Sequence, residues 1–321
     1  MNKKIIIVGG DPNSINSEII FKSWKKINKT QKKRIYLISN FDLIQKQFNK
    51  LNYRIPLYKV KTINEKVKTN KLKILDVMLK FKEPFKVDKD LSSKYVLRSL
   101  NLAHKLGLEE NVIGIINCAI NKKLLKKSNT GVTEYLASKC KVKNDSEVML
   151  IGNRKLYVSP ITTHLDIRRV SSNLKKTIII NKLKVINNWY IKKLKKKPLI
   201  GILGLNPHNS ELRKNSEEIK IIIPAIKYLK KMGLNLNGPL IADTLFIKNY
   251  KKFDVIIGMY HDQVIAPFKT LYKFDAINIT LGLKYLRVSP DHGVALDLIG
   301  KNKANASSLV ECINFINKFG K

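Results

Sequence analysis

Three of the five histidines in this chain stand just beyond short apolar runs. His208 follows residues 199–203, His261 follows residues 254–259, and His164 lies in a Thr-Thr-His context. Such runs are typical of buried strands, and open α/β sheets bind ligands beyond the carboxyl ends of their strands. Because imidazole nitrogens are common ligands of divalent metals, the three histidines predict one shared metal site, which favours an enzyme over a scaffold.

The distances between these histidines along the chain match no local zinc motif, so the spacing by itself is weak evidence. A single histidine is more often a hydrogen-bonded structural residue than a ligand. Here Asn, Asp or Thr stands near each one and can orient the ring through its second nitrogen. Three neutral imidazoles leave coordination positions open for a substrate, which is typical of a catalytic metal site.

A second group of candidates is cationic or polar and lies nearer the C-terminus. Lys269 follows His261, Arg287 is flanked by apolar residues, and Asn278 lies between them. Arginine binds phosphates and carboxylates through two parallel hydrogen bonds, and lysine can supply a point charge or transfer a proton. In so basic a chain any single lysine is typical of the surface, so Arg287 is the stronger candidate.

A third candidate region is the stretch from Asp291 to Asn305. The chain has no Gly-x-Gly-x-x-Gly after a strand, so the common dinucleotide fingerprint is missing. A dinucleotide would therefore have to bind to another kind of loop.

Short apolar runs alternate with stretches of helical periodicity along the chain, and these elements would position the candidate residues. This alternation predicts an α/β protein with a largely parallel sheet. We expect Ser17 to cap a helix that runs to Lys26, and Gly107 to stop another. Strands are expected at residues 5–8, 34–38 and 112–116, and helices at 89–106, 171–197 and 217–231.

The composition is that of a globular protein, with 44% hydrophobic residues, but 62 basic against 24 acidic side chains give a net charge of +38. This charge prompts the hypothesis of a nucleic-acid-binding protein. The lysines are spread over nearly every segment, and the chain shows no recognition motif or aromatic platform, so a solvated surface explains them better. The start of the chain resembles neither a signal peptide nor a membrane span, and three scattered cysteines indicate no disulfide framework, so we expect a cytoplasmic protein.

Four further motifs stand out along the chain, which are Asn206-Pro207-His208, residues 238–246, Met259-Tyr260-His261-Asp262-Gln263 and residues 278–283. Together with the stretch from Asp291, they resemble the 4-hydroxythreonine-4-phosphate dehydrogenase family of pyridoxine biosynthesis. The similarity runs from the opening loop to the C-terminal helix. The stretch from Asp291 also resembles the adenosine-binding loop of the wider isocitrate and isopropylmalate dehydrogenase superfamily.

This resemblance implies two α/β/α domains with an active-site cleft between them, and a homodimer with shared active sites. Together with a polar stretch at residues 122–131 and Ser289-Pro290, it suggests a discontinuous cofactor-binding domain, 1–128 with 289–321. Residues 129–288 would form the metal, substrate and dimerisation domain.

The resemblance also assigns roles to individual residues. His164, His208 and His261 would hold one divalent ion, zinc, cobalt or magnesium, and NAD or NADP would be the cofactor. Asp243, Asp262 and Lys269 are candidates for the catalytic base. Substrate would bind to Thr133, Lys269, Asn278 and Arg287, and the cofactor to His292, Gly293, Asp297 and Asn305.

The implied reaction is the oxidation of 4-phosphooxy-L-threonine to 2-amino-3-oxo-4-phosphooxybutanoate, which decarboxylates to 3-amino-2-oxopropyl phosphate. The chain departs from the family at two places. Val132 replaces the histidine of a Gly-His-Thr-Glu substrate motif, and the opening loop, residues 10–18, lacks two glycines and a proline of the family pattern. These departures leave two alternatives to this reaction open. The chain could be a sister dehydrogenase that acts on another phosphorylated hydroxy acid, such as a phosphothreonate, or a remnant of the enzyme with low activity.

Overall fold

The structure, a computed structural model, describes residues 3–65, 67, 69–125, 131–142, 146–273 and 275–319. It divides into two compact units. Unit 1 comprises Met1–Cys140 and Leu283–Lys321, and unit 2 comprises Lys141–Gly282. The sequence suggested changes of domain at 128/129, which lies outside the described residues, and at 288/289. The roles that it gave to the two domains stay predictions.

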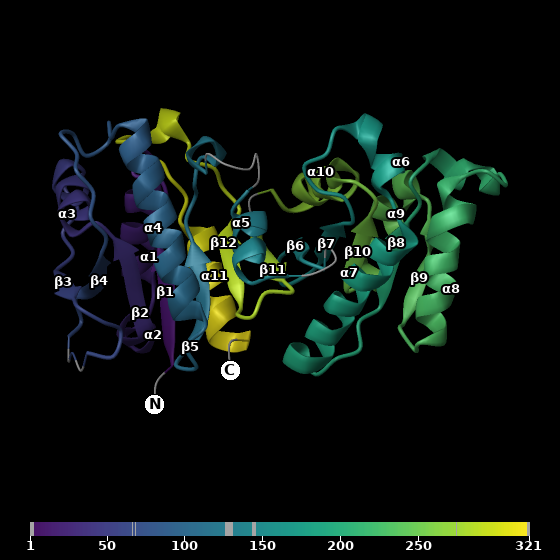
Figure 1. Cartoon of the computed structure of the whole chain (residues 1–321), viewed down its shortest axis with the longest axis horizontal. Coiled ribbons are helices and arrows are strands. Elements are labelled where there is room, and N and C mark those ends of the chain that lie inside the picture. Colours follow the sequence, from purple (N-terminus) through teal and green to yellow (C-terminus); the bar gives the residue numbers. More distant parts are fainter. Residues whose placement is uncertain are drawn as a thin grey trace. The chain divides into compact units, whose positions relative to one another are not determined.

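Among the described residues, unit 1 contains six strands, which pair with one another in parallel (Figure 1). In spatial order the strands are β3 (Leu57–Val60), β4 (Leu72–Asp76), β2 (Ile35–Ser39), β1 (Lys4–Val8), β5 (Val112–Asn117) and β12 (Arg287–Pro290). Ile, Leu and Val make up most of the central strands β1, β2 and β5, as expected where helices cover both faces of a parallel sheet. The predicted strands at 5–8, 34–38 and 112–116 are confirmed.

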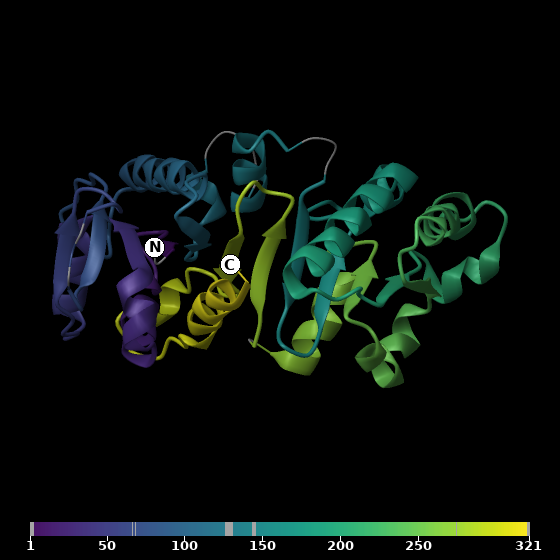
Figure 2. The ribbon, with the colours of Figure 1, turned by 90° about the horizontal axis from the view of Figure 1, so that it is seen from below.

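The helices of unit 1 lie on both faces of these strands. Figure 2 shows the blue α4 on one side and the purple α1 and yellow α11 on the other. Helix α4 contacts β1 and β5, whereas α11 contacts β5, β12 and α1, so the two ends of the chain pack together. The helices are α1 (Asn16–Lys26), α2 (Lys29–Arg34), α3 (Phe41–Lys50), α4 (Lys89–Gly107), α5 (Val132–Lys139) and α11 (Ser307–Phe319), with short 3-10 turns Lys122–Leu124 and Leu296–Leu298.

Two predicted helix ends in unit 1 differ from the structure. Ser17 does not cap α1, which already begins at Asn16 after Ile15 with no side-chain cap; Ser17 is 2% exposed inside the first turn. Gly107 is the last residue of α4 rather than a stop after it. A Cβ there would lie 2.6 Å from the Ile115 side chain, so this glycine serves close packing against β5.

The described residues of unit 2 form six strands, which pair partly in parallel and partly antiparallel. Parallel pairing joins β7 to β10, β10 to β8 and β8 to β9, while β6 runs antiparallel to both β7 and β11. The fold is therefore mixed α/β, with the parallel strands running from β7 to β9 at the end of the spatial order. In spatial order the strands are β11 (Ile277–Leu281), β6 (Val148–Gly152), β7 (Tyr157–Pro160), β10 (Val255–Gly258), β8 (Ile200–Leu203) and β9 (Leu236–Leu240).

The helices of unit 2 include α7, which contacts β6 and β11, and α10, which contacts β7 and β10. They are α6 (Val170–Asn173), α7 (Lys176–Trp189), α8 (Ile223–Lys231), α9 (Ala242–Lys248) and α10 (His261–Tyr272), with π turns Tyr190–Leu194 and Glu218–Ile222 and 3-10 turns Ile167–Arg169, Pro207–Leu212 and Tyr250–Lys252.

Of the two helices predicted for this unit, one prediction is wrong and the other is confirmed. The single helix at 171–197 is wrong, because the backbone turns extended at Leu174 and buries its side chain to 2% exposure, which breaks the helix between α6 and α7. The helix at 217–231 is confirmed as a π turn continued by α8, and Gly233 follows it at φ 84°.

Within the described part of the chain, no helix combines the length and apolarity needed to cross a membrane. Cys118, Cys140 and Cys312 are free thiols in the interior. The interior of unit 1 also holds one lysine, Lys73 on β4, which is 3% exposed, donates to the carbonyl of Lys33 at 2.5 Å and stacks 4.2 Å over the Tyr36 ring. Burial, together with the charge of Lys4, lowers the pKa of Lys73 to about 8.

This lysine makes stability depend on pH in a defined direction. The unfolded chain, with the ordinary pKa of 10.5, binds the proton more tightly, so the free energy of unfolding rises as the pH goes from about 8 to 10.5. We expect Lys73→Met to stabilise the protein at pH 7 by about 1 to 2 kcal/mol, with a gain that shrinks over that range. Urea unfolding at several pH values measures it. Lys59→Met, at an exposed lysine paired with Asp76, is the control and should give no gain.

Candidate active site

The three candidate metal histidines follow three neighbouring parallel strands of unit 2. Strand β10 lies between β7 and β8, with Gly258 opposite Pro160 and Ile257 opposite Ile202, so the three strands end at the same level. Their loops then lead to His164 after β7, His261 after β10 and His208 after β8. The prediction that apolar strands precede these histidines is confirmed.

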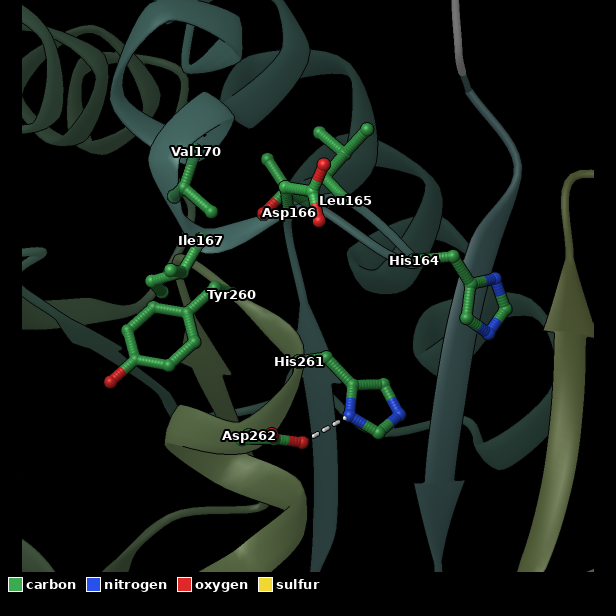
Figure 3. A pocket seen from close by; sticks show the side chains of 9 residues that line it. His164, Leu165, Asp166, Ile167, Val170, Tyr260, His261 and Asp262 are labelled. Atoms are coloured by element: carbon green, nitrogen blue, oxygen red, sulfur yellow. Dashed lines mark hydrogen bonds and ion pairs between the residues drawn. The ribbon is translucent and has the colours of Figure 1, made fainter.

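Two of these histidines lie together. The rings of His164 and His261 have their centroids 6.1 Å apart and are inclined by 31°. Figure 3 shows them side by side at a pocket of about 400 Å³. Asp166 and Asp262 add two carboxylates to its lining. The remaining lining residues are Thr162, Leu165, Ile167, Val170 and Tyr260.

Asp262 orients the ring of His261. The Nδ1 atom of His261 and Oδ1 of Asp262 are 2.6 Å apart, and the dashed line in Figure 3 marks this contact. An ionised carboxylate only accepts hydrogen bonds, so Nδ1 carries the proton and the lone pair is left on Nε2. This is the arrangement in which a carboxylate fixes the tautomer of a metal-binding imidazole. The sequence had offered Asp262 as a base, whereas this geometry suits it to positioning His261.

Two imidazoles bound to one ion, with a metal–nitrogen distance of about 2.1 Å, have ring centroids roughly 4.5 to 5.5 Å apart at octahedral or tetrahedral angles. The 6.1 Å between the His164 and His261 centroids is close to that spacing but wider. His208 is exposed and does not line the pocket, and within the described residues no three His, Cys, Asp or Glu side chains form a group that could hold a metal. The three-histidine centre therefore stays a prediction.

His208 begins a left-handed turn. The five residues from His208 to Leu212 all have φ between 50° and 57°. For residues with a Cβ this conformation costs about 1 to 2 kcal/mol each, so strain is concentrated beside a candidate ligand. Asn209 and Ser210 are buried in this turn, whereas Glu211 is exposed.

Buried carboxylates hold the start of the same loop. Glu218 is fully buried, and its Oε1 accepts from the backbone N–H groups of Leu205 and Asn206 at 2.8 and 2.9 Å. The side chain of Asn206 donates to Glu217, which also accepts from the Ser171 hydroxyl. These contacts tie the loop before His208 to α6, next to the pocket residue Val170. Sequence reasoning missed this anchor, because glutamates in a helical stretch are usually solvated.

Unit 1 brings together two of the predicted substrate residues. Arg287, at the start of β12, is 3% exposed and donates through Nε to Oδ1 of Asn117 at 2.6 Å and through Nη1 to the Thr133 hydroxyl at 3.1 Å. Burial lowers the pKa of Arg287 to about 10, and Glu134 opposes that drop. The guanidinium stays charged at neutral pH. Asn117, the last residue of β5, was missed by the sequence reasoning, although it ends an apolar run as the histidines do.

Side-chain hydrogen bonds fix the opening loop of unit 1, residues 10–18, which lacks two glycines and a proline of the family pattern. Asn13 donates to the carbonyl of Val87 and accepts from its N–H, both at 2.8 Å. Asn16 donates to the carbonyl of Ala119 at 2.8 Å. The amide side chains of Asn13 and Asn16 therefore fix the shape of the opening loop by hydrogen bonds to backbone groups.

The candidate cofactor stretch is fastened to α1. Glu18, which is 1% exposed, accepts from the N–H of Ala304 at 2.8 Å, and Lys22 donates to the carbonyls of Asn302 and Ala304. Nδ1 of His292 lies 2.9 Å from the carbonyl of Gly293, and its Nε2 is buried with no hydrogen-bond partner among the described residues. Burial lowers the pKa of His292, so the ring is neutral and presents an acceptor. This orphaned nitrogen fits a role in ligand binding.

The other predicted site residues lie on several different elements. Lys269 is half-buried in α10, about 12 Å along the helix from His261, and Asp243 is exposed in the first turn of α9. Oδ1 of Asn278 on β11 is buried with no hydrogen-bond partner in the described part of the chain, which fits a ligand contact. Asp297 and Asn305 are exposed, and Asn305 accepts from the N–H of Ser307 at the start of α11.

Comparison with known sequences places the chain among named enzymes. The family model "Pyridoxal phosphate biosynthetic protein PdxA" matches residues 30–316. Proteins named 4-hydroxythreonine-4-phosphate dehydrogenase from Sulfurihydrogenibium sp. and Aquifex aeolicus are 37% and 36% identical, over 97% and 98% of this chain and 96% and 98% of theirs. A protein of Oceanobacillus iheyensis named putative D-threonate 4-phosphate dehydrogenase is 31% identical over 98% of this chain and 97% of its own length.

Solved structures give the same picture. A 4-hydroxythreonine-4-phosphate dehydrogenase of Klebsiella pneumoniae matches with a TM-score of 0.85 and 27% identity, over 99% of this chain and all of the other. An isocitrate dehydrogenase of Methylococcus capsulatus shares the fold, with a TM-score of 0.50 and 9% identity over 98% of this chain and 84% of its own. The named relatives make the chain an oxidoreductase of the dehydrogenase type, and its fold is shared with isocitrate dehydrogenase. The chain belongs to the PdxA family of pyridoxal phosphate biosynthetic proteins.

The left-handed turn after His208 generates a prediction about stability. Glu211 is exposed at φ 50°, so Glu211→Gly removes the Cβ clash at the cost of more freedom in the unfolded chain. We expect a net stabilisation of about 0.5 to 1 kcal/mol, measured by urea unfolding. Lys230→Gly, at an exposed position in α8, is the control and should lose about 1 kcal/mol. A loss at both positions would show that the turn at Glu211 carries no such strain.

Proposed function

We propose that the protein catalyses the NAD(P)-dependent and divalent-metal-dependent oxidation of 4-phosphooxy-L-threonine to 2-amino-3-oxo-4-phosphooxybutanoate, which decarboxylates to 3-amino-2-oxopropyl phosphate, in pyridoxal phosphate biosynthesis. Family membership and two full-length relatives with that dehydrogenase name support the reaction. The observation that carries the proposal is the His164–His261 pair beyond the ends of parallel strands, with Asp262 fixing one ring.

The metal, zinc, cobalt or magnesium, would be held by His164, His261 and His208. When bound, it supplies a Lewis acid that polarises the substrate hydroxyl. Asp262 keeps the proton of His261 on Nδ1 and so leaves a lone pair on Nε2, which would bind the ion. The loop of His208, anchored by Glu218, would bring the third imidazole to the pair.

The oxidation removes a hydride from C3 of the substrate and the proton of its hydroxyl; the nicotinamide, when bound, would accept the hydride, and a base of the protein would take the proton. Lys269 and Asp243 are the proposed candidates for that base, since Asp262 is engaged with His261. The product is a β-keto acid, whose carbonyl accepts the electron pair that remains when CO2 leaves. Val170, an apolar side chain that is 2% exposed, lines one part of the pocket.

Anionic groups of the substrate are assigned to Arg287 and Thr133 in unit 1 and to Lys269 and Asn278 in unit 2. Arg287 supports this assignment best, because a buried guanidinium already aligned by Asn117 attracts phosphate or carboxylate strongly. The cofactor, NAD or NADP, is assigned to the stretch with His292, Gly293, Asp297 and Asn305, on the strength of the unpartnered His292 Nε2.

A homodimer in the cytoplasm is the proposed state of the protein. Large apolar side chains exposed on unit 2, including Ile167, Leu212 and Ile247 at 65%, 52% and 70%, support a subunit interface.

A sister activity on another phosphorylated hydroxy acid is the second candidate. Val132, half-buried at the start of α5 next to Thr133, offers no hydrogen bond where the family has a histidine. The relative named putative D-threonate 4-phosphate dehydrogenase supports the same alternative.

The metal-dependent reaction is tested by NADH formation from 4-phosphooxy-L-threonine with and without EDTA. We expect EDTA to abolish the rate and zinc, cobalt or magnesium to restore it. His261→Ala should lower kcat/KM by at least about a hundredfold, because one ligand of the ion is lost. Full activity of this variant, or of His208→Ala, would contradict the proposed centre.

The substrate is tested through Val132. If the missing histidine contacts 4-phosphooxy-L-threonine, Val132→His supplies a hydrogen bond to a charged group and raises kcat/KM about 10- to 100-fold. The same assay with D-threonate 4-phosphate is run in parallel. A wild-type preference for D-threonate 4-phosphate that Val132→His diminishes would establish the sister activity instead.

A further inference from the structure

The loops that carry His261 and His208 begin where the pairing of β10 with β8 ends. The recorded pairing of β10 with β8 ends at Ile257 opposite Ile202. Continued by two residues, this register places Met259 opposite Gly204. His261 lies two residues beyond Met259, and His208 lies four residues beyond Gly204, so the separation at this rung sets the separation of the two histidine loops.

A side-chain amide occupies that rung. Oε1 of Gln263 accepts from the N–H of Met259 at 2.7 Å, and its Nε2 donates to the carbonyl of Gly204, also at 2.7 Å. The amide of Gln263 thus takes the place of a peptide group between the two strands, one acceptor toward β10 and one donor toward β8. Both backbone groups are satisfied without the strands meeting directly.

The other side of β10 is closed by direct pairing. The carbonyl of Met259 accepts from both the N–H and the hydroxyl of Thr162, at 3.1 and 2.7 Å. Thr162 precedes His164 by two residues, which explains why the rings of His164 and His261 lie together. The side-chain amide of Gln263 therefore lies between the His261 and His208 loops, whereas the His261 and His164 loops contact each other directly through Met259 and Thr162.

The start of α10 is shaped to deliver this side chain. Gln263 lies in the first turn of α10, and the helix folds back over the end of β10. A Cβ on Gly258 would lie 3.1 Å from Oε1 of Gln263 and 2.6 Å from the Val264 side chain. Gly258 therefore leaves room for the amide.

We propose that Gln263 is a positioning residue for the metal centre, which sets the distance of the His208 loop from the His164–His261 pair. The inference rests on the proposed metal site and adds a residue that contacts neither metal nor substrate. It acts through the backbone of Met259 and Gly204. Its loss changes the spacing of the ligands while the ligands themselves remain.

The test is a Co²⁺ titration of the metal-free protein, followed by the visible absorption of the bound ion. Gln263→Leu removes both hydrogen bonds, and Gln263→Glu keeps the acceptor for Met259 but places a carboxylate oxygen against the carbonyl of Gly204. We expect both variants to bind Co²⁺ at least about tenfold more weakly than the wild type, with an altered absorption band. Wild-type affinity and spectrum in both would overturn the inference.

Two further variants make the result interpretable. Thr270→Val removes an exposed side-chain hydrogen bond, to the carbonyl of Ala266, from the same helix and should leave Co²⁺ binding unchanged. His261→Ala should abolish it. If the wild type binds no Co²⁺, or His261→Ala binds it normally, the proposed metal site fails, and the role of Gln263 fails with it. If His261→Ala alone loses binding, only the role of Gln263 is refuted. Thermal unfolding of each metal-free variant checks the fold, and Gln263→Glu decides the matter if Gln263→Leu does not fold.

Discussion

Level parallel pairing of β10 with β7 on one side and β8 on the other is the constraint on which the candidate site depends. Because these strands end together, their loops leave the sheet at one edge, and each loop carries one histidine within five residues of its strand. The strands rest on a dense core that includes Val158, Ile256 and Phe268, all without exposed surface. A rigid base of this kind lets short loops hold side chains at defined distances.

Side-chain amides that imitate peptide groups recur in this molecule. Asn13 pairs with both backbone groups of Val87, Asn16 donates to Ala119, and Gln263 spans Met259 and Gly204. An amide carries one acceptor and a donor group, so it can continue a ladder where the backbone itself diverges. In the opening loop these amide hydrogen bonds fix a segment that lacks two glycines and a proline of the family pattern.

Charge in the interior is arranged differently in the two units. In unit 1 the buried Arg287 stays protonated at neutral pH, donates to oxygens of Asn117 and Thr133, and feels the charge of Glu134. In unit 2 the buried Glu218 accepts from backbone N–H groups and anchors the loop before His208. The +38 of the whole chain adds a field that attracts phosphorylated substrates.

The sequence by itself determined the apolar strands, the polar residues that follow them and therefore the identity of the candidate ligands, because burial of Ile, Leu and Val is readable from short runs. It also indicated Arg287, since an arginine between apolar neighbours is drawn into the interior. Only the tertiary structure decided that β10 lies between β7 and β8, that Asp262 orients His261 and that Gln263 bridges two loops. It likewise decided the break at Leu174 and the uncapped start of α1. These features depend on contacts between residues far apart in the chain, or on local burial that outweighs helix periodicity, and neither leaves a pattern in the order of the residues.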